Sequence, residues 1–213
     1  MRKFLVVLLL GFAGLLSGCS SLNQAMGGNS EKDALIQASW GFAAEGIAIK
    51  VDASPALNFY DAQPHPLVLA VVQLTESTPF YQLLADENQL TKILQGDKPP
   101  AAFLSIRRYA ILPGQQALIR LDRSQNTRLI GVIPAYFGEN IAKSARLFNV
   151  PLTVDKSGLI VSEYKAEAAV SELTLKLGED ALLSGSIAAL SPEVPQQGET
   201  GPPDETGAIQ LSD

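Results

Sequence analysis

The stretch Gln63-Pro-His-Pro-Leu-Val-Leu-Ala-Val-Val-Gln-Leu74 decides the fold class. Prolines on both sides of His65 mark a stiff loop, since proline fixes its own φ angle and lacks a backbone donor. The residues that follow, Leu67–Leu74, are almost continuously apolar, which is typical of a central strand buried on both faces. The sequence therefore predicts a rigid loop that leads into the middle of a β-sheet.

Segments on either side of this strand also have β-strand patterning. Apolar and polar residues alternate along 47–52 and 172–177, as in half-buried strands. Turns are expected at Pro113-Gly114 and at the polar residues 122–127. Further strands are expected in four segments: Ala102–Ala110, Gln116–Leu121, Leu129–Tyr136 and Arg146–Val154. About seven short strands separated by turns predict an antiparallel β-sandwich.

Residues 78–94 break the strand pattern. Thr78 stands at a capping position and Pro79 at the first helical position, and apolar residues then recur at roughly helical spacing up to Leu94. This predicts one or two short helices that cover the sandwich. Gly131, inside an apolar strand, is expected to mark a bulge or a close packing contact.

The chain begins with a secretory signal. Arg2 and Lys3 precede the apolar stretch 4–16, which is too short to span a bilayer comfortably. The small residues before Cys19 resemble a bacterial lipoprotein cleavage site, in which Cys19 becomes the acylated first residue. Several acyl chains together anchor a protein stably in lipid. Ser20, where an aspartate would typically retain the protein in the inner membrane, implies the outer membrane with the domain facing the periplasm.

The sequence divides the chain into four expected parts. Residues 1–18 are the signal peptide, and residues 19–44 are the lipidated N-terminus and a tether, whose ends would lie about 25–30 Å apart if wholly flexible. Within the tether, Ser30-Glu-Lys-Asp33 has the pattern of a helix cap. Residues 45–190 form the β-sandwich domain. Residues 191–213 contain prolines and acidic residues without a basic one, which predicts a disordered tail.

Composition argues against several functions. Cys19 is the only cysteine, so the mature chain has no intramolecular disulfide and no free thiol nucleophile. Removal of Arg2 and Lys3 takes the formal net charge from −6 to −8, which argues against nucleic acid as a partner. His65 lacks both a nucleophile elbow and clustered metal donors nearby. We expect no catalytic residue, no metal site and no cofactor, and therefore a binding or scaffolding role.

Four motifs follow one another in a specific order: the stretch 63–74 with its Pro-x-Pro approach to a strand, Phe80-x-x-Leu83-x-x-Asp86-x-x-x-Leu90, Arg108-Tyr-Ala-Ile-Leu-Pro-Gly114 and Leu129-Ile-Gly-Val-Ile133. Behind a lipoprotein signal, this combination resembles the outer-membrane lipoprotein family of bacterial type VI secretion systems, called TssJ. The resemblance implies a transthyretin-like antiparallel β-sandwich of about seven or eight strands with a small helical addition.

The same resemblance implies a scaffold rather than an enzyme. Members of the family bind the periplasmic C-terminal domain of the inner-membrane protein TssM, in a membrane complex that also contains TssL. The loop between the first two strands contributes to that contact. The matching residues of this sequence are Asn58, Phe59, Tyr60, Asp61, Ala62, Gln63, Pro64 and His65.

The aromatic residues of this loop allow other interpretations. One ring can fold inward and fix the turn, whereas two exposed rings form an apolar patch that a partner must cover. Tyr60 is also compatible with a periplasmic glycan- or small-molecule-binding lipoprotein, and His65 with a hydrolase. We favour a loop stiffened by its prolines, with at least one aromatic ring facing a partner protein together with Asp61 and Gln63.

Overall fold

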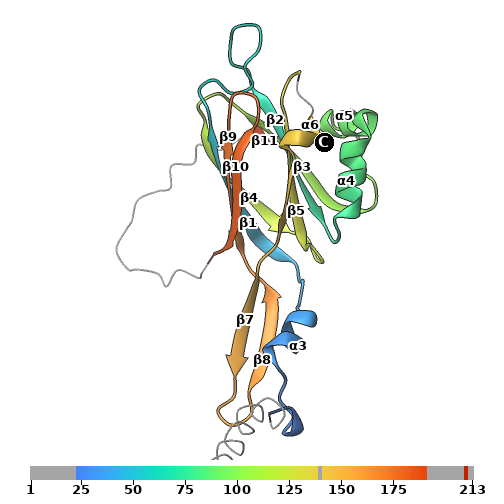
Figure 1. Cartoon of the computed structure of the whole chain (residues 1–213), viewed down its shortest axis with the longest axis vertical. Helices are drawn as coiled ribbons and strands as arrows, with labels where there is room; N and C mark the ends of the chain where they lie inside the picture. Colours follow the sequence, from blue (N-terminus) through green and yellow to red (C-terminus); the bar gives the residue numbers. More distant parts are fainter. Residues whose placement is uncertain (1–22, 139–140, 191–208, 211–213) are drawn as a thin grey trace, which may run out of the picture. The chain divides into compact units, whose positions relative to one another are not determined.

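The computed structural model describes residues 23–138, 141–190 and 209–210 (Figure 1). The signal peptide, Cys19 and most of the tail predicted to be disordered lie outside these residues. The chain divides into two compact units. The larger contains Trp40–Pro151 and the residues from Ala168 onward, and the smaller contains the N-terminal segment up to Ser39 together with Leu152–Glu167. Leu152–Glu167, which the sequence places inside the sandwich domain, therefore belongs to the other unit.

The described part of the larger unit contains two β-sheets (Figure 1). The first has the order β10-β9-β1-β4, with β10 at Leu182–Ala189, β9 at Ser171–Leu177, β1 at Ala43–Ala53 and β4 at Gln116–Arg123. The second has the order β11-β3-β2-β5-β6, with β11 at Ile209–Gln210, β3 at Phe103–Ile111, β2 at Leu67–Leu74, β5 at Leu129–Ala135 and β6 at Arg146–Asn149. The predicted β-sandwich is confirmed.

Strand β2 lies in the middle of the second sheet, as its apolar run predicted. It pairs antiparallel with β3 on one edge and with β5 on the other. Leu69, Val72 and Leu74 are fully buried. Its one polar residue, Gln73, is also buried and bonds the main chain of Asp122 at the end of β4 and of Ser124 just after it.

Two features of the sheets differ from the expectation. Strand β1 pairs antiparallel with β4 but parallel with β9, so the sandwich is not purely antiparallel. The strand predicted over Arg146–Val154 is interrupted at Pro151, which has no backbone N–H to donate to a sheet. Its first part is β6, and its second part begins β7 (Leu152–Ser157) of the smaller unit.

Three strands were not predicted at all: β8 (Glu163–Ala168), β10 and β11. β10 is exposed along most of its length and contains Gly185, so its sequence has little of the alternation that signals a strand. β11 pairs with Tyr109 and Ala110 on the outer edge of β3. This short piece of the predicted disordered tail is therefore a strand.

The helical segment is α4 (Thr78–Ala85) followed by α5 (Glu87–Leu94), with a further short helix, α6, at Ile141–Ser144. Ser77 precedes α4, so Thr78 is its first helical residue rather than its cap. Phe80 and Ile93 are buried in the same apolar cluster as residues of β2, β3 and β5. Both helices thus cover the second sheet, as predicted (Figure 1).

Arg108 holds the end of α5. Its side chain is 4% exposed, and Nη1 donates to the Ile93 carbonyl oxygen over 3.0 Å. The guanidinium group adds a second donor to a carbonyl that the Gly96 N–H also reaches over 3.3 Å, and its positive charge favours the negative end of the helix dipole. The arginine in the motif that resembles the secretion lipoproteins therefore has a structural role.

The smaller unit consists of a hairpin and the N-terminal segment. Strands β7 and β8 (Glu163–Ala168) form a two-stranded sheet, and α3 (Glu31–Ile36) precedes it in the chain. The predicted cap is present: Ser30 Oγ accepts from the Asp33 N–H, and the Asp33 carboxylate accepts from the Ser30 N–H. The Ser30 hydroxyl also donates to the Asp33 carboxylate over 2.6 Å, and this bond together with the one from the Ser30 N–H lowers the pKa of Asp33. Within the described residues, no helix is long and apolar enough to cross a membrane.

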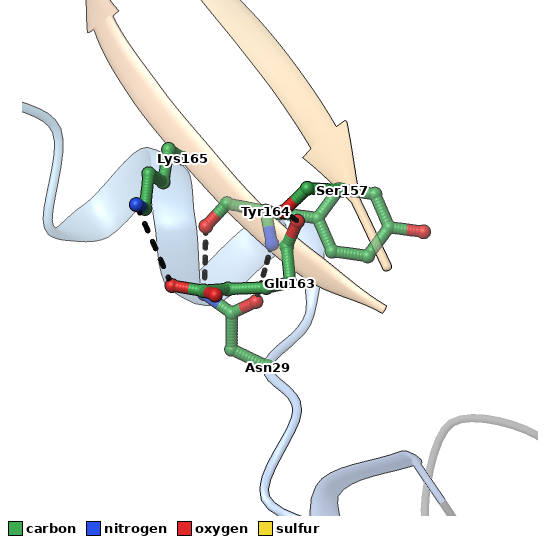
Figure 2. Close-up of polar contacts among 5 residues, drawn as sticks. All are labelled: Asn29, Ser157, Glu163, Tyr164 and Lys165. Carbon is green, nitrogen blue, oxygen red and sulfur yellow. Dashed lines mark hydrogen bonds and ion pairs between the residues drawn. The ribbon is translucent and has the colours of Figure 1, made fainter. Parts of the chain in front are cut away.

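The segment predicted as a flexible tether differs from that expectation. The Asn29 amide donates to the Tyr164 carbonyl oxygen over 2.8 Å and accepts from the Tyr164 N–H over 2.6 Å (Figure 2). The Asn23 side chain makes the same pair of bonds with Ser162, at 2.9 and 2.7 Å. These amides supply the open edge of β8 with the partners that another strand would provide. From residue 23 onward, the segment is held against the hairpin.

Gly131 provides a test of the core. A Cβ atom at this position would lie 2.5 Å from Phe80 Cε2 and 2.6 Å from Val72 Cγ2, so close packing explains the glycine. We predict that Gly131→Ala lowers the free energy of unfolding by about 1–3 kcal/mol, because the Phe80 ring must move. Denaturant unfolding measures the change. Gly41→Ala is the matched control, since nothing lies within 4 Å of its added Cβ. Equal losses for both variants would contradict the packing role.

A candidate docking surface formed by three loops

The loop between β1 and β2 contains a tight turn. The main-chain groups of Tyr60 and Gln63 bond each other in both directions, each over 3.1 Å. Asp61 and Ala62, the central residues, have φ angles of 51° and 60°. Two positive φ angles define a type I′ turn, which usually contains asparagine and glycine. Alanine in this region costs roughly 1–2 kcal/mol, so the surrounding contacts must hold the turn in place.

Asn58 provides one of these contacts. It is 6% exposed and has a φ angle of 48°. Its Nδ2 donates to the Pro66 carbonyl oxygen over 3.0 Å, and its Oδ1 accepts from the Phe137 N–H over 2.8 Å. Asn58 therefore joins the two ends of the turn to the segment after β5. Although the sequence groups it with the partner-binding residues, its side chain is used inside the protein.

Three aromatic rings are stacked beside the turn. The Tyr60 ring lies 3.6 Å from the His65 ring with an interplanar angle of 12°, and 4.1 Å from the Phe137 ring with an angle of 26°. Tyr60 thus lies between the other two. His65 Nε2 is 3.2 Å from the Tyr60 carbonyl oxygen, and its main-chain N–H donates to Leu57. The histidine is therefore a packing element of the loop.

A third loop, between β9 and β10, reaches the same place. The Phe59 N–H donates to the Glu179 carbonyl oxygen over 3.1 Å. The Tyr136 hydroxyl lies 2.9 Å from the Ala181 carbonyl oxygen and 3.3 Å from that of Gly178. The buried Tyr136 fixes the segment after β5, and the next residue, Phe137, is exposed at the surface. The three loops form one connected surface.

We define the docking surface by its exposed members. The Phe59 ring is 44% exposed and the Phe137 ring 65% exposed, and Tyr60 is half-buried between its neighbours. The exposed polar residues around these rings are Asp61, Gln63, Glu179 and Asp180. An apolar patch with an acidic rim matches the usual anatomy of a protein-binding surface, in which apolar residues are central and polar ones surround them.

The sequence alone did not identify Phe137 or the β9–β10 turn as parts of this surface. Phe137 follows a strand directly, where an aromatic residue is ordinarily taken for core. A pair of adjacent aromatics, Tyr136-Phe137, at the end of a strand is the one local sign that one of them faces outward. The Phe59 N–H bonds the main chain of Glu179, so the residue type at this position gives no sign of that contact.

This geometry defines a class of protein. A two-sheet sandwich whose loops present apolar rings at one end is suited to binding another macromolecule. Among the described residues, no group of three or more His, Cys, Asp and Glu side chains is arranged to hold a metal ion.

The chain belongs to the family described as "Type VI secretion lipoprotein, VasD, EvfM, TssJ, VC_A0113", whose profile matches residues 45–178. The resemblance noted in the sequence is thereby confirmed, and the matching family is one of secretion-system lipoproteins rather than of enzymes. No curated protein sequence matches the chain.

Solved structures with a similar fold include two lipoproteins of this secretion system. The type VI lipoprotein TssJ1 from Pseudomonas aeruginosa is 23% identical over 68% of this chain and 95% of its own, with a TM-score of 0.48. Lip from Serratia marcescens, a membrane-bound component of the system, is 19% identical over 66% of this chain and 96% of its own, with a TM-score of 0.46. The C-terminal domain of TssM from EAEC is 12% identical over 68% of this chain and 98% of its own, with a TM-score of 0.47.

Tyr136 makes the stability of this region depend on pH. Burial raises the pKa of its phenol well above the ordinary value of 10, and the negative charge of Asp180 acts in the same direction. Above pH 10 the unfolded chain loses this proton while the folded chain keeps it, so folding stability falls as pH rises. The slope is up to about 1.4 kcal/mol per pH unit for one group.

We therefore predict that Tyr136→Phe reduces the alkaline loss of stability, measured as the free energy of unfolding between pH 9 and roughly pH 11. Below pH 9 the same variant is expected to be less stable by about 0.5–1.5 kcal/mol, because the hydrogen bond to Ala181 is lost. Tyr81→Phe, at an exposed position on α4, is the control. An unchanged slope in Tyr136→Phe would contradict the assignment.

Proposed function

We propose that this lipoprotein links the type VI membrane complex to the outer membrane. Acylated Cys19 anchors it to lipid on the periplasmic face, and its docking surface binds the periplasmic C-terminal domain of TssM, in a complex that includes TssL. Membership of the secretion lipoprotein family supports the role. The observation that carries the site is the loop Asn58–His65, whose main chain is held in place by internal hydrogen bonds while its Phe59 is exposed.

Rigidity favours binding by this loop. Association costs free energy for each segment that must become ordered, and the type I′ turn, the Asn58 bonds and the ring stack place Tyr60 in a fixed orientation beforehand. These contacts hold Ala62 in its strained main-chain conformation, and strained residues of this kind are common at binding sites. The loop therefore gains more from each contact than a mobile loop of the same composition.

The chemistry of the surface indicates what the partner must provide. Phe59 and Phe137 require an apolar recess, because aromatic anchors contribute most when they are fully desolvated. Asp61, Glu179 and Asp180 favour basic residues around that recess. Charge complementarity at the rim acts mainly on the rate of association, so this rate should fall as salt concentration rises.

We predict that Phe59→Ala and Phe137→Ala each weaken binding to the TssM periplasmic domain by at least tenfold, or about 1.4 kcal/mol. Calorimetric titration with the purified domain measures the affinity. Tyr81→Ala is the matched control, since Tyr81 is 60% exposed on α4. Melting curves establish that each variant is folded. If both phenylalanine variants keep an affinity within twofold of the wild type, the docking surface is not part of the interface with TssM.

The membrane anchor is tested separately. Cys19→Ser is expected to move the protein from the outer-membrane fraction to the soluble periplasmic fraction, because no acyl chain can be attached. Mass spectrometry of the wild-type N-terminal peptide measures the acylation directly. Ser20→Asp should retain acylation and shift the protein to the inner membrane. An unmodified Cys19 in the wild type would contradict the anchor while leaving the docking surface untouched.

A further inference from the structure

The connection between β7 and β8 displays large apolar side chains in water. Leu159 is 105% exposed and Ile160 is 86% exposed, more than any other large apolar residue among those described. Burial of an apolar side chain of this size is favourable, and a side chain that stays in water does not gain that free energy. Two adjacent ones at the end of a hairpin are unlike the single exposed apolar residues that every protein surface has.

The tip of this hairpin is a defined turn. Gly158 has a φ angle of 86°, and a Cβ atom there would collide with the Val161 carbonyl oxygen. Beside the turn, Ser157 Oγ donates to the Glu163 carbonyl oxygen over 3.4 Å (Figure 2). The glycine lets the chain fold back tightly and places Leu159 and Ile160 at the end of the hairpin.

The N-terminal segment follows the outer edge of β8 toward this tip. Alternate residues of that edge are bonded to it: Ala166 O accepts from the Ser39 N–H, Tyr164 is held by Asn29, and Ser162 is held by Asn23. Since alternate residues present their main-chain groups to the same edge, these contacts run in one line. The line ends at Ser162, the residue just past the apolar tip.

The position of Asn23 links the tip to the lipid anchor. Cys19 precedes Asn23 by four residues in the sequence. Four residues span at most about 14 Å when fully extended, so Asn23 cannot lie farther than this from Cys19. This distance is less than half of the roughly 30 Å thickness of the hydrocarbon core. An acylated Cys19 lies at the surface of the lipid, so the apolar tip is kept within reach of the same monolayer.

The residues that flank the tip suit a membrane surface. Lys156 Nζ lies 5.6 Å from the centre of the Tyr164 ring. Tyrosine is favoured where apolar and aqueous phases meet, and lysine can lie along apolar surface while its charge stays in water. Carboxylates outnumber lysines among the described residues of the smaller unit. Attraction to lipid therefore has to come from the apolar tip and not from charge.

We propose that Leu159 and Ile160 insert into the lipid monolayer that holds the acyl chains of Cys19. The inference rests on the acylation of Cys19 in the proposed function and adds a second, non-covalent contact between protein and membrane. The acyl chains alone allow the protein to rotate about its N-terminus. Insertion of the hairpin fixes the orientation of the smaller unit relative to the lipid.

The lipidated full-length mature protein provides the test. Because the thiol of Cys19 is consumed by acylation, Ile160→Cys introduces one reactive thiol, which is labelled with the environment-sensitive dye NBD. The protein is reconstituted in vesicles of phosphatidylethanolamine and phosphatidylglycerol, with and without lipids that carry a quencher on the acyl chain. Leu183→Cys, at an exposed apolar position on β10, is the matched control.

We expect quenching of at least half of the emission at position 160 and little at position 183, with no dependence on salt. Leu159→Asp in the Ile160→Cys protein should abolish the quenching while the protein still floats with the vesicles. Leu159 and Ile160 are almost fully exposed, so their substitution should not unfold the protein, and melting temperatures check that the variants are folded. Equal quenching at both positions, or quenching that survives Leu159→Asp, would overturn the proposal.

Flotation separates this proposal from the anchor on which it rests. A protein that does not float lacks the lipid anchor, and the proposed attachment fails with it. A protein that floats without quenching at position 160 keeps its anchor, and only the insertion of the hairpin is refuted. Emission at position 160 that responds to the TssM periplasmic domain and not to lipid would assign the tip to a protein partner and refute insertion.

Discussion

The burial of β2 on both faces and both edges is the constraint on which the rest of the structure depends. Its neighbours β3 and β5 supply the hydrogen bonds, and the helices α4 and α5 cover the sheet through Phe80 and Ile93. Gln73, at the end of the strand, donates to the Asp122 carbonyl oxygen and accepts from the Ser124 N–H. The second sheet is thus tied to the turn that follows β4 of the first.

The same constraint places the docking surface. Because β2 starts at Leu67 and cannot shift along its neighbours without exposing apolar side chains, the loop before it must end at a fixed point. Asn58 and the Tyr60 stack then connect that loop to the segment after β5, while Phe59 connects it to the β9–β10 turn. Rigid strands position the loops, and the loops provide the chemistry.

The smaller unit uses a different means of stabilisation. Its two strands are too few to bury a core, and an isolated hairpin is marginally stable in water. The side chains of Asn23 and Asn29 compensate by bonding the open edge of β8, and the cap at Ser30 begins α3 beside it. Polar side chains thus occupy the edge without offering an apolar surface for another strand. The two most exposed large apolar residues of this unit, Leu159 and Ile160, lie at the tip of the hairpin.

Local sequence determined much of this protein: the central strand, the helical segment, the cap at Ser30 and the short motifs that indicate the family. Each of these depends on residues near one another in the chain, where periodicity, proline and glycine act directly. Only the tertiary structure decided the parallel pairing of β1 with β9, the stacking of Phe137 on Tyr60, and the bonds of Asn23 to Ser162, which lies 139 residues away. The physical reason is that an amide or a ring has the same intrinsic preferences in many settings, and its partner is fixed only when distant segments are brought together.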